Sequence, residues 1–179
     1  ATRLIPVTAE PSSPLLEVRD LHVRFRTNAG LLHAVRGVSL DVRRGETLAL
    51  VGESGSGKSQ VASAILRLTA ENGSVDGSIR FDGEELSGMP ARALNRIRGR
   101  RIGMVFQEPM TSLVPLFTVG HQIALPLRIH AGLSRGAARQ RALELLEMVR
   151  ISQPAQRLES YPHQLSGGQR QRVIIAMAM

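Results

Sequence analysis

Alternation of apolar and polar residues dominates the first hundred positions and predicts β-strands there. In Leu16–Phe25 the alternation changes register near Asp20, so we expect a half-buried strand interrupted by a bulge. Thr27–Gly30 has the composition of a turn. We expect further strands at Leu32–Val42, at Thr47–Val51 (apolar enough to be buried on both faces), at Ser78–Phe81 and, again buried, at Ile102–Val105.

Helical periodicity takes over after Gln107, where the strand signals stop. The clearest helix is Ser134–Arg150, with Ser134 as a candidate N-cap and an apolar face that includes Leu146. Other helices are expected at Lys58–Leu68, Pro90–Arg98, Val119–His130 and Gln169–Met179. The chain therefore divides into a strand-rich first part and a helical second part, with Gln107 between them.

Composition restricts the possible classes of protein. The chain has 179 residues, 42% hydrophobic and 21% charged, which is typical of one globular domain. It contains no cysteine, which excludes disulfides, thiolate zinc sites and iron–sulfur clusters in this sequence. No apolar run approaches the length that spans a membrane, and residues 1–14 lack the apolar stretch of a signal peptide. We interpret residues 1–14 as a flexible tail.

The formal net charge of +8 raises the question of nucleic-acid binding. The arginines are scattered, however, and aromatic residues make up 3% of the chain, too few for base-stacking surfaces. We therefore do not expect nucleic acid as a partner. A dispersed basic surface fits anionic lipid or an acidic protein better.

A glycine-rich segment, Gly52-Glu53-Ser54-Gly55-Ser56-Gly57-Lys58-Ser59, lies between an expected strand and an expected helix. Its spacing matches the phosphate-binding P-loop. The glycines let the backbone turn tightly and direct N–H groups inward, and the helix start adds its positive dipole end. Lys58 is predicted to neutralise the β- and γ-phosphates of a nucleotide, and the Ser59 hydroxyl to ligate Mg²⁺.

Lys58 is the single lysine among 23 Lys and Arg residues. Arginine carries a planar fork, whereas lysine carries a compact ammonium on a slim stem. Only the slim stem fits inside a loop of backbone N–H groups that surrounds a phosphate. The choice of lysine at this one position therefore supports the P-loop interpretation.

A second motif, Leu165-Ser166-Gly167-Gly168-Gln169, opens the last expected helix. Ser166 is a candidate N-cap, and the two glycines would let a phosphate approach the helix N-terminus. Taken alone, Ser-Gly-Gly is more often an ordinary loop. One nucleotide does not need two phosphate-binding helix ends in one chain, unless the second serves a neighbouring chain.

Together these two motifs resemble the nucleotide-binding subunit of ABC transporters, from about Leu15 to Met179. Gly52–Ser59 matches the Walker A loop, Gln107 the Q-loop and Leu165–Gln169 the ABC signature. Longer stretches are similar to the oligopeptide and dipeptide importer branch, which nickel and glutathione importers share, so the solute stays open. These stretches are Val51–Gln60, Phe106–Leu113 (Phe-Gln-Glu-Pro-Met-Thr-Ser-Leu) and Tyr161–Gly168 (Tyr-Pro-His-Gln-Leu-Ser-Gly-Gly).

The resemblance implies an α/β P-loop NTPase fold of the ABC ATPase type, with an antiparallel β subdomain, a partial RecA-like core and a helical subdomain. Its implied parts are the tail at 1–14, the β subdomain and P-loop core at 15–106, the Q-loop and helical subdomain at 107–168, and the start of the signature helix at 169–179. The implied activity is ATP hydrolysis coupled to transport.

The resemblance also implies roles for particular residues. Phe25 would stack on adenine, although a core strand aromatic is an equally good interpretation. Gln107 would sense Mg²⁺ and the γ-phosphate. ATP and Mg²⁺ would bind at Gly52, Glu53, Ser54, Gly55, Ser56, Gly57, Lys58, Ser59 and Gln60. The ATP of a partner subunit would bind at Ser166, Gly167, Gly168 and Gln169.

The partners implied by the resemblance are a second ABC ATPase subunit, identical or different, and transmembrane permease subunits. An extracytoplasmic solute-binding protein would act indirectly through the permease. The implied location is peripheral, on the cytoplasmic face of the inner membrane.

The sequence departs from the family where a strand beyond the signature helix normally supplies an Asp for Mg²⁺ and a Glu that polarises the attacking water. That strand is not in this sequence, so we expect an N-terminal fragment with an incomplete core and without the water-activating half of the site. The five histidines do not supply these groups: His22, His33, His121, His130 and His163.

We therefore expect the chain alone to be poorly soluble and to hydrolyse ATP no faster than background. Thr47–Val51 and Ile102–Val105 would lose covering surface. Two alternatives stay open beside the importer subunit. One is a non-catalytic remnant that at most binds nucleotide or a partner, and the other is a soluble ABC ATPase that does not transport.

Overall fold

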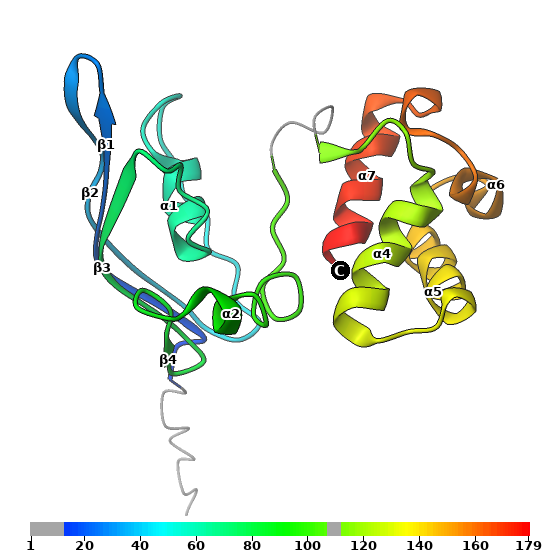
Figure 1. Ribbon diagram of the computed structural model, residues 1–179, viewed down its shortest axis with the longest axis horizontal. Helices are drawn as coiled ribbons and strands as arrows, with labels where there is room; N and C mark the ends of the chain where they lie inside the picture. Colours follow the sequence, from blue (N-terminus) through cyan, green and yellow to red (C-terminus); the bar gives the residue numbers. More distant parts are fainter. Residues whose placement is uncertain (1–12, 107–111) are drawn as a thin grey trace, which may run out of the picture. The chain divides into compact units, whose positions relative to one another are not determined.

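The computed structural model describes residues 13–106 and 112–179, which belong to two compact units (Figure 1). The first unit ends at Leu94 and contains the β-sheet. The second begins at Asn95 and contains helices α4 to α7. The change of structure expected at Gln107 thus lies inside the second unit, and Gln107 itself is outside the described residues.

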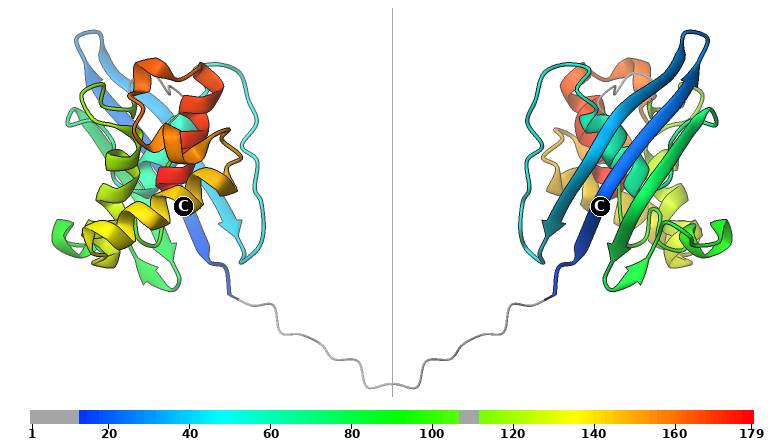
Figure 2. Two further views of the ribbon diagram at one scale, coloured as in Figure 1. Left: turned by 90° about the vertical axis from the view of Figure 1, so that its right-hand side faces the viewer. Right: turned by 90° about the vertical axis from the view of Figure 1, so that its left-hand side faces the viewer.

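An antiparallel sheet with the strand order β2-β1-β3-β4 forms the framework of the first unit (Figure 2). β1 and β2 form a hairpin that closes where Thr27 pairs with Gly30, so the turn expected there is confirmed. Three of the expected strands are confirmed within longer ones, and β3 is more than twice as long as the expected Ser78–Phe81. The strands are β1 (Leu16–Thr27), β2 (Gly30–Val42), β3 (Gly73–Phe81) and β4 (Glu84–Glu85).

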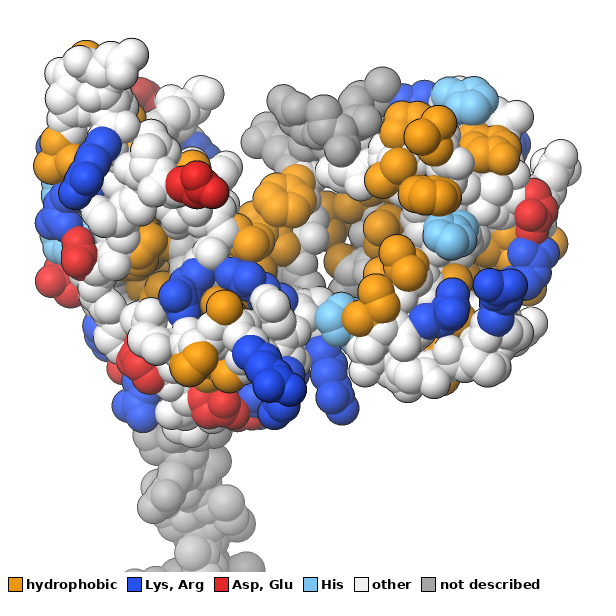
Figure 3. Space-filling model, viewed as in Figure 1, with side chains coloured by type: hydrophobic (Ala, Val, Ile, Leu, Met, Phe, Trp, Pro, Cys, Tyr) orange, Lys and Arg blue, Asp and Glu red, His pale blue; other side chains and the backbone are white. Residues whose placement is uncertain are grey.

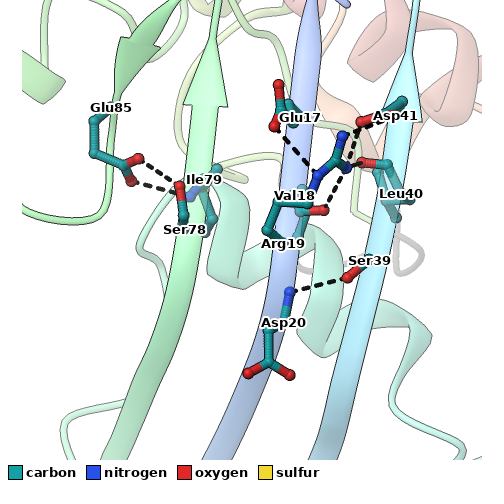
Figure 4. Close-up of polar contacts among 10 residues, drawn as sticks. All are labelled: Glu17, Val18, Arg19, Asp20, Ser39, Leu40, Asp41, Ser78, Ile79 and Glu85. Carbon is teal, nitrogen blue, oxygen red and sulfur yellow. Dashed lines mark hydrogen bonds and ion pairs between the residues drawn. The ribbon is translucent and has the colours of Figure 1, made fainter.

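The bulge expected near Asp20 is present, because the pairing of β1 with both neighbouring strands shifts register there. Asp20 has a φ of 46°, and its N–H donates to Ser39 Oγ at 3.0 Å (Figure 4). Beside it, Arg19 donates two hydrogen bonds of 2.6 and 3.0 Å to the Asp41 carboxylate. These bonds hold the pKa of Asp41 below its ordinary value and link β1 to β2 at the bulge.

Helix α1 (Lys58–Ile65) contacts β1 and β2 and buries Val61 and Ala64. It ends three residues before the expected Leu68. The core of this unit is made of apolar side chains from β1, β2 and β3: Val18, Leu21, Val23, Val35, Ile79 and Phe81. The packing of α1 on the sheet places the N-terminus of α1, and the glycine-rich loop before it, beside β2.

Two of the expected strands are wrong. Thr47–Val51 and Ile102–Val105 form no regular strand among the described residues. Val51 is 93% exposed, and Leu48, Leu50 and Val105 are also exposed. A buried strand needs hydrogen-bonded neighbours, and no described strand pairs with either segment. Both segments are apolar, as expected, but none of the strands β1 to β4 hydrogen-bonds to either segment to make it part of a sheet.

Helix α2 (Ala91–Leu94) begins after Pro90 as expected but stops before Arg98. It is shorter than expected because residues 97–102 fold into turns. The Ile97 carbonyl accepts from the N–H groups of Arg100, Arg101 and Ile102. Gly99 has a φ of 70°, which ends helical geometry.

The second unit is helical, as the periodicity after Gln107 predicts. The expected cap at Ser134 is confirmed, since its Oγ accepts from the N–H of Ala137 at 3.3 Å. No helix in the described part of the chain is long and apolar enough to cross a bilayer. The elements are α4 (Val119–Ala131), α5 (Arg135–Met148), α6 (Pro154–Leu158), the 3-10 turn η1 (Pro162–Gln164) and α7 (Gly167–Ala178).

One apolar cluster joins these helices, with residues from α4, α5 and α7 at its centre. Arg172 of α7 donates to the carbonyls of Val149 and Arg150, which lie just beyond the C-terminus of α5. The fully buried members of the cluster include Val119, Ile123, Leu145, Leu146 and Val173. This packing fixes α7, and therefore the motif at its N-terminus, against the rest of the unit.

Candidate nucleotide-binding site

The glycine-rich loop ends at Gly57, the N-cap of α1, which has a φ of 92°. A Cβ at this position would lie 2.4 Å from the Ala34 carbonyl oxygen of β2. A side chain is therefore excluded both by the backbone conformation and by the neighbouring strand. Gly55 has a φ of 79° but open space around it, so it supplies only the turn.

The N-terminus of α1 is open to an anion. No described side chain caps it, unlike the N-termini of α4, α5 and α7. The unbonded N–H groups of a first helical turn, together with the helix dipole, favour a negatively charged ligand. Ser59 and Gln60 lie in this first turn, and the N–H of Gln60 already donates to the Gly57 carbonyl at 2.9 Å. The loop and the helix start thus have the form that a phosphate group requires.

The Lys58 ammonium lies within the loop itself. Its Nζ donates to the carbonyl oxygens of Gly52 and Glu53 at 2.8 and 2.6 Å, and to Ser56 Oγ at 3.3 Å. All three donors of the ammonium therefore meet loop oxygens. A phosphate oxygen would replace at least one of these contacts, with the remaining ones keeping the charge in place.

A cavity of about 550 Å³ opens beside this loop within the first unit. It is lined by the loop and by the middle of β2, including Leu32, Ala34, Val35, Gly52, Gly57 and Lys58. Its size is in the range of small-molecule sites. The cavity therefore has room for an organic ligand next to the proposed phosphate position.

Phe25 is half-buried and is not among the residues that line this cavity. It pairs with Gly73 of β3, and a Cβ on Gly73 would lie 2.8 Å from Phe25 Cε1 and 2.5 Å from Thr69 Cγ2. The ring thus covers the backbone of Gly73. This contact fits a packing role, and stacking on adenine stays a prediction for Phe25.

Gly57→Ala should weaken both folding and nucleotide binding. The change combines strain at a φ of 92° with overlap against a backbone carbonyl, so we expect about 1–3 kcal/mol less stability. Displacement of the loop should lower nucleotide affinity by about tenfold or more, measured by titration with a fluorescent ATP analogue. Gly55→Ala is the matched control, because its positive φ also strains an alanine but its Cβ would not overlap with any neighbouring atom. Equal effects of both substitutions would contradict the steric argument.

The second motif lies at the N-terminus of α7, in the other unit. Ser166 Oγ accepts from the N–H of Gln169 at 3.3 Å, and Gln169 Oε1 accepts from the N–H of Ser166 at 3.1 Å. This reciprocal capping box fixes the start of the helix. Gly167 and Gly168 are exposed, and a Cβ added at either position would have no atom within 4 Å. The helix end is thus rigid and sterically open.

Gln107, expected to sense Mg²⁺ and the γ-phosphate, lies outside the described residues. Residues 114–117 are held by Gln122, which sequence reasoning did not single out. Gln122 is 5% exposed; its Oε1 accepts from the N–H of Val114, and its Nε2 donates to the carbonyls of Val114 and Phe117. The sequence signal that could have identified Gln122 is its position as a polar residue on the apolar face of the expected helix Val119–His130. Gln122 anchors the segment 114–117 to α4.

The magnesium expectation depends on Ser59 together with Gln107. Among the described residues, no group of three or more His, Cys, Asp or Glu side chains converges as a metal site. The single hydroxyl of Ser59 at the first turn of α1 cannot hold Mg²⁺ alone, so a nucleotide phosphate would have to supply further oxygen ligands. The donor set of this chain therefore fits Mg²⁺ only together with a nucleotide.

The family model for the ABC transporter matches residues 35–179, which is most of the sequence. The chain therefore belongs to the ABC transporter family, and the resemblance inferred from its motifs is confirmed. The α/β fold of the ABC ATPase type is confirmed as well. Two solved dimeric structures of the bacterial ABC transporter cassette MJ0796, one of them in a post-hydrolysis state bound to ADP and Pi, match with a TM-score of 0.81 and 31% identity over 92% of this chain and 68% of theirs.

The curated relatives of this chain carry peptide-importer names. The oligopeptide transport ATP-binding protein OppD of Mycobacterium tuberculosis is 53% identical over 168 residues, and that of Salmonella typhimurium 46% over 170. A putative peptide import ATP-binding protein of Brucella abortus is 50% identical over 169 residues. The matches cover 93–95% of this chain, but only 28% of the mycobacterial protein and 51% of the other two. This chain thus spans about half the length of most of these relatives, or less.

Proposed function

We propose that this chain is the nucleotide-binding part of an ATP-hydrolysing subunit that powers a peptide importer. The observation that carries the proposal is the Lys58 ammonium held by three oxygens of its own glycine-rich loop, beside an uncapped helix N-terminus and a cavity. Membership of the ABC transporter family and the names of the relatives support the coupling to peptide import.

In this proposal, ATP lies in the cavity with its phosphates in the loop Gly52–Ser59. Lys58 exchanges a loop oxygen for the β- and γ-phosphates, and the first turn of α1 donates N–H groups to the same anion. Mg²⁺, held by Ser59 and by Gln107, would neutralise charge on the phosphates. Phe25 is proposed as the aromatic neighbour of adenine.

A second subunit, identical or different, completes the ATP site. Ser166, Gly167, Gly168 and Gln169 would bind the γ-phosphate of the ATP held by that partner, so that two subunits enclose two ATP molecules. The exposed glycines and the fixed N-terminus of α7 support this role. ATP favours the closed pair because it makes contacts there that the open pair cannot make.

The α4 side of the second unit is proposed to contact the permease at the cytoplasmic face of the inner membrane. Apolar side chains gather on this unit around α4 (Figure 3), and the exposed ones include Leu116, Phe117, Leu125 and Ile129. Exposed apolar surface of this kind is typical of a protein interface. An extracytoplasmic solute-binding protein would act through the permease.

The test measures ATP hydrolysis by the whole transporter, reconstituted in vesicles with its permease and solute-binding protein. We expect oligopeptides to stimulate ATP hydrolysis several-fold and to accumulate in the vesicles. Nickel ions and glutathione, the solutes of similar importers, should do neither. Stimulation by one of these instead would overturn the peptide assignment, and nucleotide-independent uptake would overturn the energy-coupling role.

A further inference from the structure

A cavity of about 400 Å³ lies between α4 and α5, within the second unit. It shares no residue with the cavity beside the glycine-rich loop. Three arginines line it: Arg128 from α4, and Arg135 and Arg139 from α5. The proposed function gives these arginines no role. The remaining lining residues come from the start and middle of α4: Thr118, Gly120, His121, Ala124 and Leu125.

Helix geometry directs the charged side chains to one place. His121, Leu125 and Arg128 follow one another at spacings of four and three residues, so they share one face of α4. Arg135 and Arg139 are four residues apart and share a face of α5. Buried apolar packing of α4 against α5 holds the two faces side by side. The three arginines therefore surround one concave space.

The positive charge of this cavity is only partly balanced. Arg139 Nη1 lies 2.5 Å from Glu159 Oε1 and is paired with it. Arg128 and Arg135 form no ion pair with any carboxylate in the described part of the chain. An anionic ligand is therefore the electrostatic complement of the cavity.

Arg135 stands where a positive charge costs the helix stability. It is the first residue of α5, directly after the N-cap Ser134. The N-terminus of a helix carries a partial positive charge, so a cation there is unfavourable. The first turn of α5 contains no acidic residue that would compensate. The charge of Arg135 therefore does not serve the folding of α5, and it points to a negatively charged ligand.

Apolar side chains project at the edge of the same cavity. Leu125 is 43% exposed, and Ile129, one turn further along α4, is 67% exposed. Apolar and arginine side chains lie side by side on this unit (Figure 3). A protein partner normally inserts its anchors into concave apolar pockets, whereas here the concave part carries the arginines and the apolar side chains project. This arrangement suits an anionic membrane surface, which offers charged headgroups and an apolar boundary below them.

We propose that the cavity between α4 and α5 binds the phosphate headgroup of an anionic phospholipid. Arg128 and Arg135 donate N–H groups to the phosphate oxygens, because a guanidinium matches phosphate geometry. Leu125 and Ile129 enter the boundary between headgroups and acyl chains. The inference rests on the proposed location of the α4 side at the membrane and adds lipid, beside the permease, as a partner. It does not involve the nucleotide.

The test measures binding of the whole protein, without nucleotide, to lipid vesicles by flotation. Vesicles of phosphatidylcholine with phosphatidylglycerol should bind the protein at least about tenfold more tightly than vesicles of phosphatidylcholine alone, and added salt should weaken this binding. Arg128→Glu and Arg135→Glu should each lower binding to the anionic vesicles about tenfold. Vesicles that bind no protein, or bind it equally with and without phosphatidylglycerol, would overturn the proposal.

Arg141→Glu is the matched control for charge. Arg141 also lies on α5, but two residues after Arg139 and therefore on another face, and it does not line the cavity. Its replacement should leave vesicle binding unchanged, and equal losses in all three variants would show a diffuse attraction instead of a site. Arg135→Glu separates binding from folding. A carboxylate at the first position of α5 favours the helix, so the melting temperature should not fall while vesicle binding does.

Further measurements distinguish a lipid from other anions. Ile129→Ser should weaken vesicle binding several-fold, because a headgroup bound to a membrane brings the apolar boundary with it. Soluble glycerol phosphate should not displace the protein from vesicles. If it does so at the same phosphate concentration as the lipid, the ligand is a soluble phosphate and the lipid proposal is wrong. If the permease in detergent, and not the vesicles, requires Arg128 and Arg135, the partner is an acidic protein segment and the proposal is equally wrong.

Titration of the same variants with a fluorescent ATP analogue keeps this inference separate from the proposed function. Arg128 and Arg135 line the cavity of the second unit, and the glycine-rich loop lies in the first. Nucleotide affinity should therefore be unchanged in both variants. Lost vesicle binding with normal nucleotide binding supports the lipid site. A parallel loss of nucleotide affinity would mean that the substitutions damage the whole protein, and it would overturn the assignment of these arginines to lipid.

Discussion

Lys58→Ala should lower the affinity for ATP by at least about 100-fold, equivalent to about 2.8 kcal/mol. The ammonium is the positive charge already fixed in the loop, and its loss would leave the phosphates facing carbonyl oxygens of Gly52 and Glu53. The measurement is a titration with a fluorescent ATP analogue in the presence of Mg²⁺. Circular dichroism and thermal denaturation should show that the variant is folded.

Lys58→Arg separates charge from shape. A guanidinium keeps the charge but spreads its donors over a planar fork, which cannot direct three donors from one atom to three loop oxygens. We expect this variant to bind ATP nearly as poorly as Lys58→Ala. If Lys58→Arg binds like the unmodified protein, a positive charge alone is sufficient, and the argument from the single lysine is wrong.

Local sequence patterns were sufficient for the elements that depend on neighbours in the chain. The hairpin of β1 and β2, the bulge at Asp20 and the caps at Ser134 and Ser166 all follow from side-chain type and spacing. The glycine-rich loop could be predicted from the sequence as well. Glycine is required at position 57 because of its positive φ and its contact with Ala34, so the residue type itself marks the loop. These features are specified within a few residues or within one hairpin.

Features that depend on distant partners were not predictable in the same way. The composition of Thr47–Val51 is that of a buried strand, but whether it becomes one depends on the strands that pair with it. The contacts of Gln122 with the loop at 114–117 are set by how α4 packs, which no local pattern reveals. The position of Phe25 over Gly73 is similarly a result of strand register.

The two motifs raise a question of assembly, because one unit carries the phosphate loop and the other the signature. A single nucleotide needs one fixed cation and one helix N-terminus, and the first unit supplies both. The N-terminus of α7 is nevertheless fixed by its capping box and exposed. It begins with two glycines, although a Cβ at either position would meet no atom of this chain within 4 Å. This open surface supports the proposed role of the α7 N-terminus in binding the γ-phosphate of ATP held by a second subunit.

Gly168→Glu should therefore abolish ATP-driven pairing and lower ATP hydrolysis by the whole protein at least about 100-fold, while leaving nucleotide binding to the first unit unchanged. Gly168 is the second residue of α7 and has open space around it, so the substitution disturbs no packing. A carboxylate in a first helical turn is favourable for the helix, so the melting temperature should not fall. The same carboxylate would repel the γ-phosphate.

The matched control is Gly136→Glu. Gly136 is also the second residue of its helix, α5, and a Cβ added there would likewise have no atom within 4 Å. It places the same charge in the same local geometry but away from the signature, so pairing and hydrolysis should stay normal. Pairing is measured by size-exclusion chromatography with ATP, under conditions that prevent hydrolysis. Equal loss of pairing in both variants would mean that the added charge, and not its position in the signature, is responsible. Normal pairing in both variants would show that the N-terminus of α7 is not part of the ATP interface.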